Sequence, residues 1–250
     1  MAITETARRN HEELFPNHTS TLAETDPEFV EVFDNFAFDE ALGYCELDTH
    51  TRLLAVLAAL IAQHAVSEYR AMLKGALNAG VTPVEVKEIV YQAVAYVGIG
   101  RVFDFLHATN DVLAARGVRL PLEPQATTTP ENRLERGLEL SKSVFGELID
   151  HMYQESPEGQ AHIQHMISGF AFGDFYSRTG LAMPERELMT FVQLAALGGC
   201  EPQLKAHIAG NAAVGNDKAK LVSVLTQLVP FLGFPRTLNA LRCVNEVLGK

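Results

Sequence analysis

The sequence lacks a surplus of positive charge. Its 250 residues include 20 lysines and arginines against 31 aspartates and glutamates, for a formal net charge of -11. The basic side chains form no stripe interleaved with aromatic ones, so nucleic-acid binding has little support. The acidity instead favours solubility, and we expect no nucleic-acid partner.

Long apolar segments are also missing. The longest uninterrupted apolar run, Leu53 to Ala62, has ten residues, about half of a membrane-spanning helix, and indicates a buried helix. Residues 1–10 contain Glu5, Arg8 and Arg9 but no apolar core, unlike a secretory signal. We therefore expect a cytoplasmic protein with no membrane partner.

Cysteines are few. Cys45, Cys200 and Cys243 are odd in number and far apart, so no disulfide framework or zinc-ligand spacing follows from them. Glycine-rich phosphate loops, nucleophile elbows and nucleotide fingerprints do not occur either. We expect neither a metal ion nor another cofactor.

Strand signals are absent, because no alternating apolar run is bounded by hairpin dipeptides. Helix signals recur instead. Leucines between Leu53 and Ile61 are three and four residues apart, which makes one apolar helix face. Thr82 to Glu85 has the N-cap, first-turn proline and capping acid of a helix start. Pro184 opens a helix that we expect to run through Leu197, and Phe234 opens the last one.

The sequence also repeats itself at an interval of about 135 residues, which is the first feature to seek in any chain. With Gly75 placed on Gly210, residues 51–113 match residues 186–248 without a gap. Identical residues stand at Leu53/Leu188, Gly75/Gly210, Gly80/Gly215, Gln92/Gln227, Val94/Val229, Gly98/Gly233, Arg101/Arg236, Asn110/Asn245, Val112/Val247 and Leu113/Leu248. Three glycines and an arginine at shared offsets are hard to ascribe to chance, so we infer a duplication.

Further upstream the interval is shorter by a single position. Phe36-Ala37-Phe38 matches Phe170-Ala171-Phe172, and Glu13-Leu14 matches Glu147-Leu148. A single insertion or deletion between the two blocks accounts for the change of interval.

The two copies are joined by a proline-rich segment. Three prolines and a run of three threonines lie between Gly117 and Pro130, and proline cannot continue a helix. We predict a first helical repeat at residues 1–117, a linker at 118–130 and a second helical repeat at 131–250.

The second copy contains the candidate catalytic residues. Glu187 lies near the start of one helix, and Cys200 and His207 follow a glycine pair, seven residues apart. On a continuous helix the last two share one side, two turns apart. A histidine beside a carboxylate or thiol can act as a general base or proton shuttle. Alternatively, Cys200 is a small buried hydrophobe at a helix junction.

These residues resemble the carboxymuconolactone decarboxylase family, which includes the alkylhydroperoxidase D-like proteins. The resemblance rests on Cys200-Glu-Pro-Gln-Leu-Lys-Ala-His207 with Gly215 after it, on Leu232 to Leu241, and on Val81 to Glu88. It covers most of both copies and implies an all-α fold of two tandem bundles of this family. Single-copy relatives form ring-like trimers or hexamers, so the resemblance implies a homo-oligomer, a trimer of two-repeat chains.

The family's peroxidase branch uses Cys-x-x-Cys-x-x-x-His, with a supporting glutamate on the preceding helix. Here Gln203 replaces the second cysteine, and the family's pattern implies the supporting glutamate at Leu188, one residue after Glu187. In the first copy the two cysteines and the histidine are replaced by Ala65, Glu68 and Met72. A dithiol cycle cannot run within either copy. The peroxidase alternative is an oxidoreductase with Cys200 as a lone thiol, resolved by an external thiol.

The decarboxylase branch needs no cysteine pair and is our first interpretation. It implies a lyase acting on a small carboxylated lactone or related acid, with His207 in proton transfer and Glu187 and Cys200 lining the pocket. Arg236 could clamp the substrate carboxylate, or be structural, because Arg101 recurs in the copy that lacks the histidine. A further alternative is a small-molecule binding protein that has lost the chemistry.

The first copy offers candidates of its own. His64 stands at the break between helices and Glu68 four residues later, within reach on one helix face. They form either a substrate-binding polar site or a solvated surface pair. Glu85 looks like a capping acid, and Glu88 like a surface acid.

Overall fold

The structure, a computed structural model, describes residues 2–44 and 46–249, so Cys45 lies outside the described residues. These residues form helices and connections without a strand, as the sequence predicts. No helix among them is long and apolar enough to cross a membrane.

The first copy begins with short helices and ends with four longer ones. Its elements are α1 (Glu5–Leu14), α2 (Leu22–Thr25), α3 (Pro27–Asn35), the π-helix η1 (Phe36–Glu40), α4 (Ala41–Gly43), α5 (Thr49–Ala62), α6 (Val66–Asn78), α7 (Pro83–Val97) and α8 (Ile99–Ala115). The expected helix start at Thr82 is confirmed: its hydroxyl accepts from the Glu85 N–H, and the Glu85 carboxylate accepts from the Thr82 N–H. Gly98, with φ of 80°, ends α7.

The second copy repeats this order without a counterpart of α4 among its described residues. Its elements are α9 (Arg133–Phe145), α10 (Leu148–Gln154), α11 (Ala161–Met166), the π-helix η2 (Ile167–Tyr176), α12 (Met183–Leu197), α13 (Glu201–Ala213), α14 (Lys218–Leu232) and α15 (Phe234–Leu248). The predicted helices that open at Pro184 and Phe234 are both present.

The helix boundaries correct the repeat register at one point. The number of residues between the starts of corresponding helices equals the interval of the gapless match for α6 and α13, α7 and α14, and α8 and α15. For α5 and α12 it is smaller by one residue. Arg52 therefore corresponds to Arg186, and Leu53 to Glu187, instead of to Leu188 as the gapless match predicts. The extra residue lies between the start of α12 and the start of α13.

One upstream match also needs correction. Phe36 and Phe170 both lie in π-helices, so that match is confirmed. Glu13, however, lies in the last turn of α1, whereas Glu147 precedes the first turn of α10. Because the two glutamates stand at different places relative to their helices, this short identity is coincidental.

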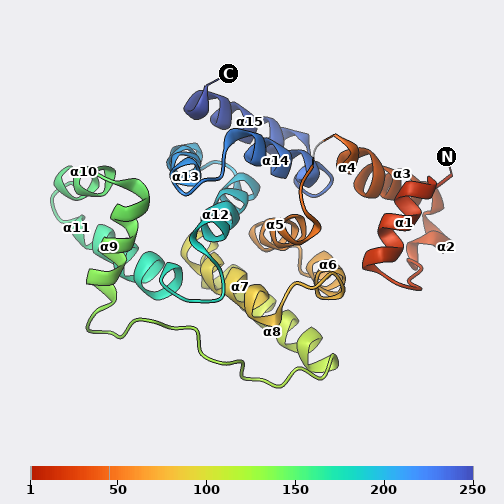
Figure 1. The fold of residues 1–250 in the computed structure, drawn as a ribbon, viewed down its shortest axis with the longest axis horizontal. Coiled ribbons are helices and arrows are strands. Elements are labelled where there is room, and N and C mark those ends of the chain that lie inside the picture. The colour runs from red at the N-terminus through yellow and green to blue at the C-terminus, as the bar shows by residue number, and fades with distance from the viewer. Residues whose placement is uncertain (1, 45, 250) are drawn as a thin grey trace.

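The two copies share one core. Helix α5 of the first copy packs against α12 of the second, and α12 also packs against α7 and α13. A single cluster of buried apolar residues draws on both copies. In Figure 1, α1–α4 lie at one side, α9–α11 at the other and α5, α7 and α12 between them, with the linker running along one edge.

Candidate functional site

Helices α12 and α13 bring Glu187 and His207 together. Oε2 of Glu187 lies 2.9 Å from Nδ1 of His207. The glutamate side chain is fully buried, and the histidine side chain keeps 12% of its surface exposed. An ionised carboxylate accepts a hydrogen bond from Nδ1, which fixes the ring and leaves Nε2 to exchange a proton. The pair thus has the geometry of an oriented proton-transfer group.

Aromatic rings and a glycine shape the space around this pair. The rings of Tyr96 and Phe145 stand edge-on to the His207 ring, with centroids 5.6 and 5.3 Å away. A Cβ added to Gly210 would lie 2.7 Å from Oε2 of Glu187 and 2.7 Å from the Phe145 ring. The close approach of α13 to both side chains therefore requires glycine at this position.

Asn211 joins the two helices of the pair. Its side-chain amide donates to the carbonyl of Glu187 at 2.9 Å and to the carbonyl of His207 at 2.8 Å. Asn216 donates in turn to the Asn211 side-chain oxygen at 2.8 Å. Because Asn211 holds both backbones, α12 and α13 cannot slide past each other without breaking buried hydrogen bonds.

One acceptor in the site is unused. Oε1 of Glu187 is buried and has no hydrogen-bond partner among the described residues. Buried carboxylate oxygens are normally hydrogen-bonded, so such an atom calls for an explanation. A ligand or water that donates a hydrogen bond to Oε1 would supply one.

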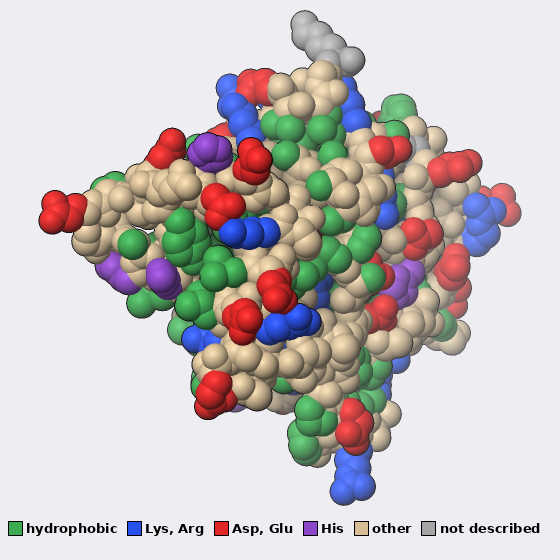
Figure 2. All heavy atoms as spheres, turned by 60° about the vertical axis from the view of Figure 1, so that its left-hand side comes forward, with side chains coloured by type: hydrophobic (Ala, Val, Ile, Leu, Met, Phe, Trp, Pro, Cys, Tyr) green, Lys and Arg blue, Asp and Glu red, His purple; other side chains and the backbone are tan. Residues whose placement is uncertain are grey.

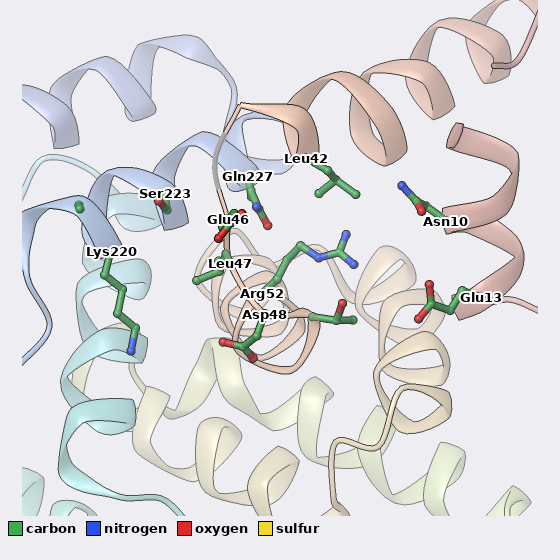
Figure 3. Close-up of a pocket in the computed structure, with 12 residues that line it drawn as sticks. Asn10, Glu13, Leu42, Glu46, Leu47, Asp48, Arg52, Lys220, Ser223 and Gln227 are labelled. Atoms are coloured by element: carbon green, nitrogen blue, oxygen red, sulfur yellow. The ribbon is translucent and has the colours of Figure 1, made fainter. Parts of the chain in front are cut away.

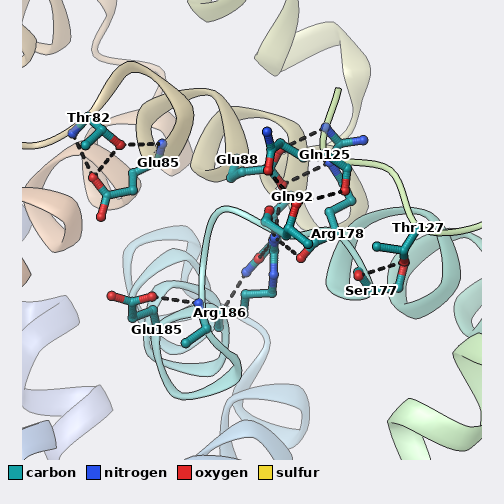
Figure 4. A network of polar contacts seen from close by, with 12 residues as sticks. Thr82, Glu85, Glu88, Gln92, Gln125, Thr127, Ser177, Arg178, Glu185 and Arg186 are labelled. Carbon is teal, nitrogen blue, oxygen red and sulfur yellow. Dashed lines mark hydrogen bonds and ion pairs between the residues drawn. The ribbon is translucent and has the colours of Figure 1, made fainter. Parts of the chain in front are cut away.

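A buried ion-pair network joins α7 to α12 and to the segment before α12 (Figure 4). Arg178 makes two-pronged contacts with Glu88 at 2.9–3.0 Å, and Arg186 donates to the same carboxylate at 3.0 Å. Glu88 and Arg186 are each 1% exposed. The expectation that Glu88 is a surface acid is therefore wrong. Its partners are about 90 and 98 residues away in the chain, so no local pattern reveals them.

Hydrogen bonds lead from this network to Tyr96, whose ring contacts the histidine. Gln92 accepts from Arg186 and donates to the hydroxyl of Thr190 at 2.8 Å. Thr190 is hydrogen-bonded to Tyr176, and the Tyr96 hydroxyl donates to that of Tyr176 at 3.0 Å. Tyr96 then contacts the His207 ring. The sequence reasoning missed both tyrosines, whose only signal is their place on helix faces.

Both tyrosines are held neutral. Burial, followed by the charge of Glu187, raises the pKa of Tyr96 and of Tyr176 above the ordinary value. They are therefore hydrogen-bond donors at neutral pH, and neither supplies a phenolate to the site.

Cys200 lies at the N-cap position of α13 and is partly buried. Its thiol donates to the carbonyl of Leu194 at 3.4 Å. Burial, followed by the charges of Glu201 and Cys243, raises the pKa of Cys200. A protonated thiol is a poor nucleophile, so this environment matches a small buried hydrophobe at a helix junction.

Arg236 lies away from the Glu187–His207 pair. It is exposed in the first turn of α15, and its Nε lies 3.5 Å from where a Cβ on Gly198 would be. Gly198 is eleven residues, or about 16 Å, along α12 from Glu187. In the first copy Arg101 donates to the carbonyl of Ala62, at the matching end of α5. The side chain of Arg236 thus lies at the C-terminus of α12, and that of Arg101 at the C-terminus of α5, where a cation is favourable.

No hydrogen bond or ion pair joins His64 to Glu68 among the described residues. His64 follows the end of α5 with a positive φ of 60°, and its Nε2 lies 3.8 Å from Asp104. Glu68 is exposed in the first turn of α6. A joint polar site at these two residues stays a prediction.

One group of described residues has metal-ligand spacing. Ligand atoms of His50, Glu85 and Glu185 all lie within 4.8 Å of one another. Glu85 and Glu185, however, each accept from a backbone N–H at the start of their own helix, at 2.7 Å. Helix capping explains both acids, and the expectation of a protein without a metal stays a prediction.

Cavities lined by described residues are formed elsewhere, and two of them are large. One, of about 710 Å³, lies between α1, α4, α5 and α14. The other, of about 480 Å³, lies between α7 and the linker. Neither is lined by Glu187, Cys200 or His207.

The comparisons with known proteins agree with this architecture. The family model described as "Carboxymuconolactone decarboxylase family" matches residues 27–111 and 161–246, more than half of the chain. The chain belongs to the carboxymuconolactone decarboxylase family. It is 30% identical over 118 residues to a 4-carboxymuconolactone decarboxylase of Acinetobacter baylyi, an alignment that covers 47% of this chain and 87% of that protein.

A solved structure shows the same fold along nearly the whole chain. It is described as a candidate gamma-carboxymuconolactone decarboxylase subunit from Burkholderia xenovorans LB400. The TM-score is 0.56 at 22% identity, covering 94% of this chain and 93% of that one. The tandem two-bundle fold is therefore shared with that structure.

Proposed function

We propose that this chain is a decarboxylase-type lyase that acts on a small carboxylated lactone or a related acid, with His207 as the proton-transfer residue. The observation that carries the proposal is the hydrogen bond between the buried Glu187 carboxylate and Nδ1 of His207. The family and the Acinetobacter relative support the reaction class.

The proposed chemistry needs one proton at carbon. The bond between the substrate carbon and its carboxylate breaks, carbon dioxide leaves, and the electron pair passes into the conjugated lactone. His207 Nε2 then donates its proton at the new carbanion position and recovers one from solvent. Glu187 stabilises the imidazolium before that transfer, and its unused Oε1 would accept from the bound acid or a water.

The test uses the full chain with 4-carboxymuconolactone, followed by release of carbon dioxide. His207→Ala should lower kcat/KM by about 10²–10⁴, the usual contribution of a general acid or base. His162→Ala, which removes an exposed histidine on α11, should leave it unchanged. Full activity in His207→Ala would contradict the assignment.

The lone-thiol alternative makes a different prediction. If Cys200 consumed peroxide with an external thiol donor, Cys200→Ser would abolish that consumption, and decarboxylation would be absent. The raised pKa of Cys200 counts against this alternative. Binding of the lactone with neither activity would instead favour a binding protein.

A further inference from the structure

The larger of the two cavities described above has an arginine at its centre. In Figure 3 the Arg52 guanidinium extends from α5 toward Asn10 and Glu13 on α1, with Gln227 of α14 on its other side. The residues that line this cavity of about 710 Å³ are Asn10, Glu13, Leu42, Glu46, Leu47, Asp48, Thr49, Arg52, Ala219, Lys220, Ser223 and Gln227. They come from both copies.

The Arg52 guanidinium lies at the cavity without a partner from the described part of the chain. Among the described residues it has no hydrogen-bond or ion-pair partner, and only the more distant Glu13 acts on it electrostatically. Burial lowers the pKa of Arg52, and Glu13 raises it in part. Because a half-buried guanidinium without a partner is costly, this position favours an added anion.

The second copy shows what such an arginine binds. Arg186, the counterpart of Arg52, donates to the carboxylate of Glu88 at 3.0 Å and to Gln92 at 3.1 Å. Gln92 corresponds to Gln227, which lines the cavity beside Arg52. At the position of Glu88, however, the other half of the molecule has Ser223. The arginine and the glutamine are repeated, and the carboxylate between them is not.

We propose that this cavity binds a small carboxylic acid, whose carboxylate takes at Arg52 the place that Glu88 takes at Arg186. Lys220 supplies a second cation to the lining. Three acids, Glu13, Glu46 and Asp48, are exposed where they line the cavity. A ligand that also carries a hydroxyl or amino group can donate to them, so we assign hydroxy or amino carboxylates as the class. This site shares no lining residue with the Glu187–His207 pair.

The first experiment measures binding by calorimetry and does not depend on lyase activity. The full chain is titrated with malate, with malamide as the neutral analogue, at fixed ionic strength. Malate should bind saturably and malamide should not. Arg52→Gln should weaken malate binding at least tenfold, whereas Arg242→Gln, at an exposed arginine, should not change it.

Three results would overturn the proposal. They are no saturable binding of malate, equal binding of malate by wild type and Arg52→Gln, or binding of inorganic phosphate at Arg52 with no binding of carboxylates. Circular dichroism of Arg52→Gln shows whether the variant is folded, so that lost binding is not mistaken for unfolding.

A second variant restores the missing carboxylate from within the chain. In Ser223→Glu, the new carboxylate should form an ion pair with Arg52, as Glu88 does with Arg186. The variant should therefore have a higher melting temperature than the ligand-free wild type and should not bind malate. Ser223→Gln has the same length without the charge, so it should raise the melting temperature less than Ser223→Glu and should weaken malate binding less. Wild-type affinity in Ser223→Glu would mean that Arg52 does not hold the ligand.

Discussion

At the scale of single residues, Gly210 decides how closely Glu187 and Phe145 approach α13. The position is helical, so alanine would by itself stabilise the helix by about 0.5–1 kcal/mol. The added methyl group would nevertheless lie 2.7 Å from Oε2 of Glu187 and 2.7 Å from the Phe145 ring. One of the two side chains must move, and either movement disturbs His207.

Gly210→Ala is therefore expected to lower both stability and the proposed lyase activity. Overpacking of this kind costs about 1–3 kcal/mol, to be measured by urea unfolding. Gly100→Ala is the matched control, because its added Cβ meets nothing within 4 Å in helix α8. Equal stability and activity in Gly210→Ala and Gly100→Ala would show that the contact at Gly210 relaxes freely.

The raised pKa of Cys200 gives a pH prediction. The thiolate is the reactive form, and a raised pKa means that this form appears only at higher pH than in an unperturbed cysteine. Alkylation of Cys200 by iodoacetamide, followed by mass spectrometry, should be slow at pH 7 and accelerate well above about pH 8.5, the ordinary pKa of cysteine. A rate that has already levelled off at pH 7 would contradict the burial argument.

At the scale of helices, Glu88 on α7 holds α12 through Arg186 and the segment before α12 through Arg178. Glu88→Gln leaves two arginines with no carboxylate between them. Removing one partner of a buried pair costs about 3–5 kcal/mol, to be measured as the free energy of unfolding in urea. Glu139→Gln breaks an ion pair whose acid is 57% exposed and should cost less than about 1 kcal/mol. Similar losses in both variants would contradict this difference.

Helix positions were predictable where the signal is local. Thr82 and Glu85 cap their own helix, and Pro184 marks the start of α12, so neighbouring residues determine these boundaries. The register at α5 was not predictable by the same means, because α12 is longer than α5 by a single position and a gapless match passes over that difference. Arg52 was therefore missed as the counterpart of Arg186.

The site was predictable in part. His207 and Glu187 were named from their residue types and their places on neighbouring predicted helices, and the structure brings them within 2.9 Å. Tyr96 and Phe145 reach the same ring from α7 and α9. No periodic pattern specifies which faces of distant helices meet, and this is why neither aromatic residue was named.

At the scale of the whole molecule, two exposed apolar patches are related by the repeat. Figure 2 shows apolar side chains gathered between charged ones on one face. Exposed apolar patches of this kind mark interfaces. We group the exposed apolar residues of α3 and α15, Phe29, Val32, Phe234 and Leu238, as the first patch, and their repeat counterparts on α11 and α8, Ile163, Met166, Ile99 and Phe103, as the second; all of them are at least 46% exposed.

We propose that these patches join copies of the chain into a closed ring, with three chains supplying six bundles. Patches that recur on two sides of one chain make head-to-tail contacts, which give rings when the rotation closes. Leu238→Glu should lower the mass in light scattering coupled to size exclusion toward 27.4 kDa, the mass of one chain. Leu22→Glu, at an exposed leucine outside both patches, should not. A wild-type protein that elutes as one chain would contradict the ring.

The replacement of Glu187 and His207 by Leu53 and Met72 in the first copy has a consequence for stoichiometry. Where bundles are separate chains, active and inactive ones would mix in random proportions. Here the linker ties one bundle that has the pair to one that lacks it. Every assembly, whatever its size, then contains the two kinds in a fixed one-to-one ratio. Mutations can accumulate in one half of the chain without altering the other half. In an assembly of identical subunits encoded by one gene, every mutation appears in all subunits.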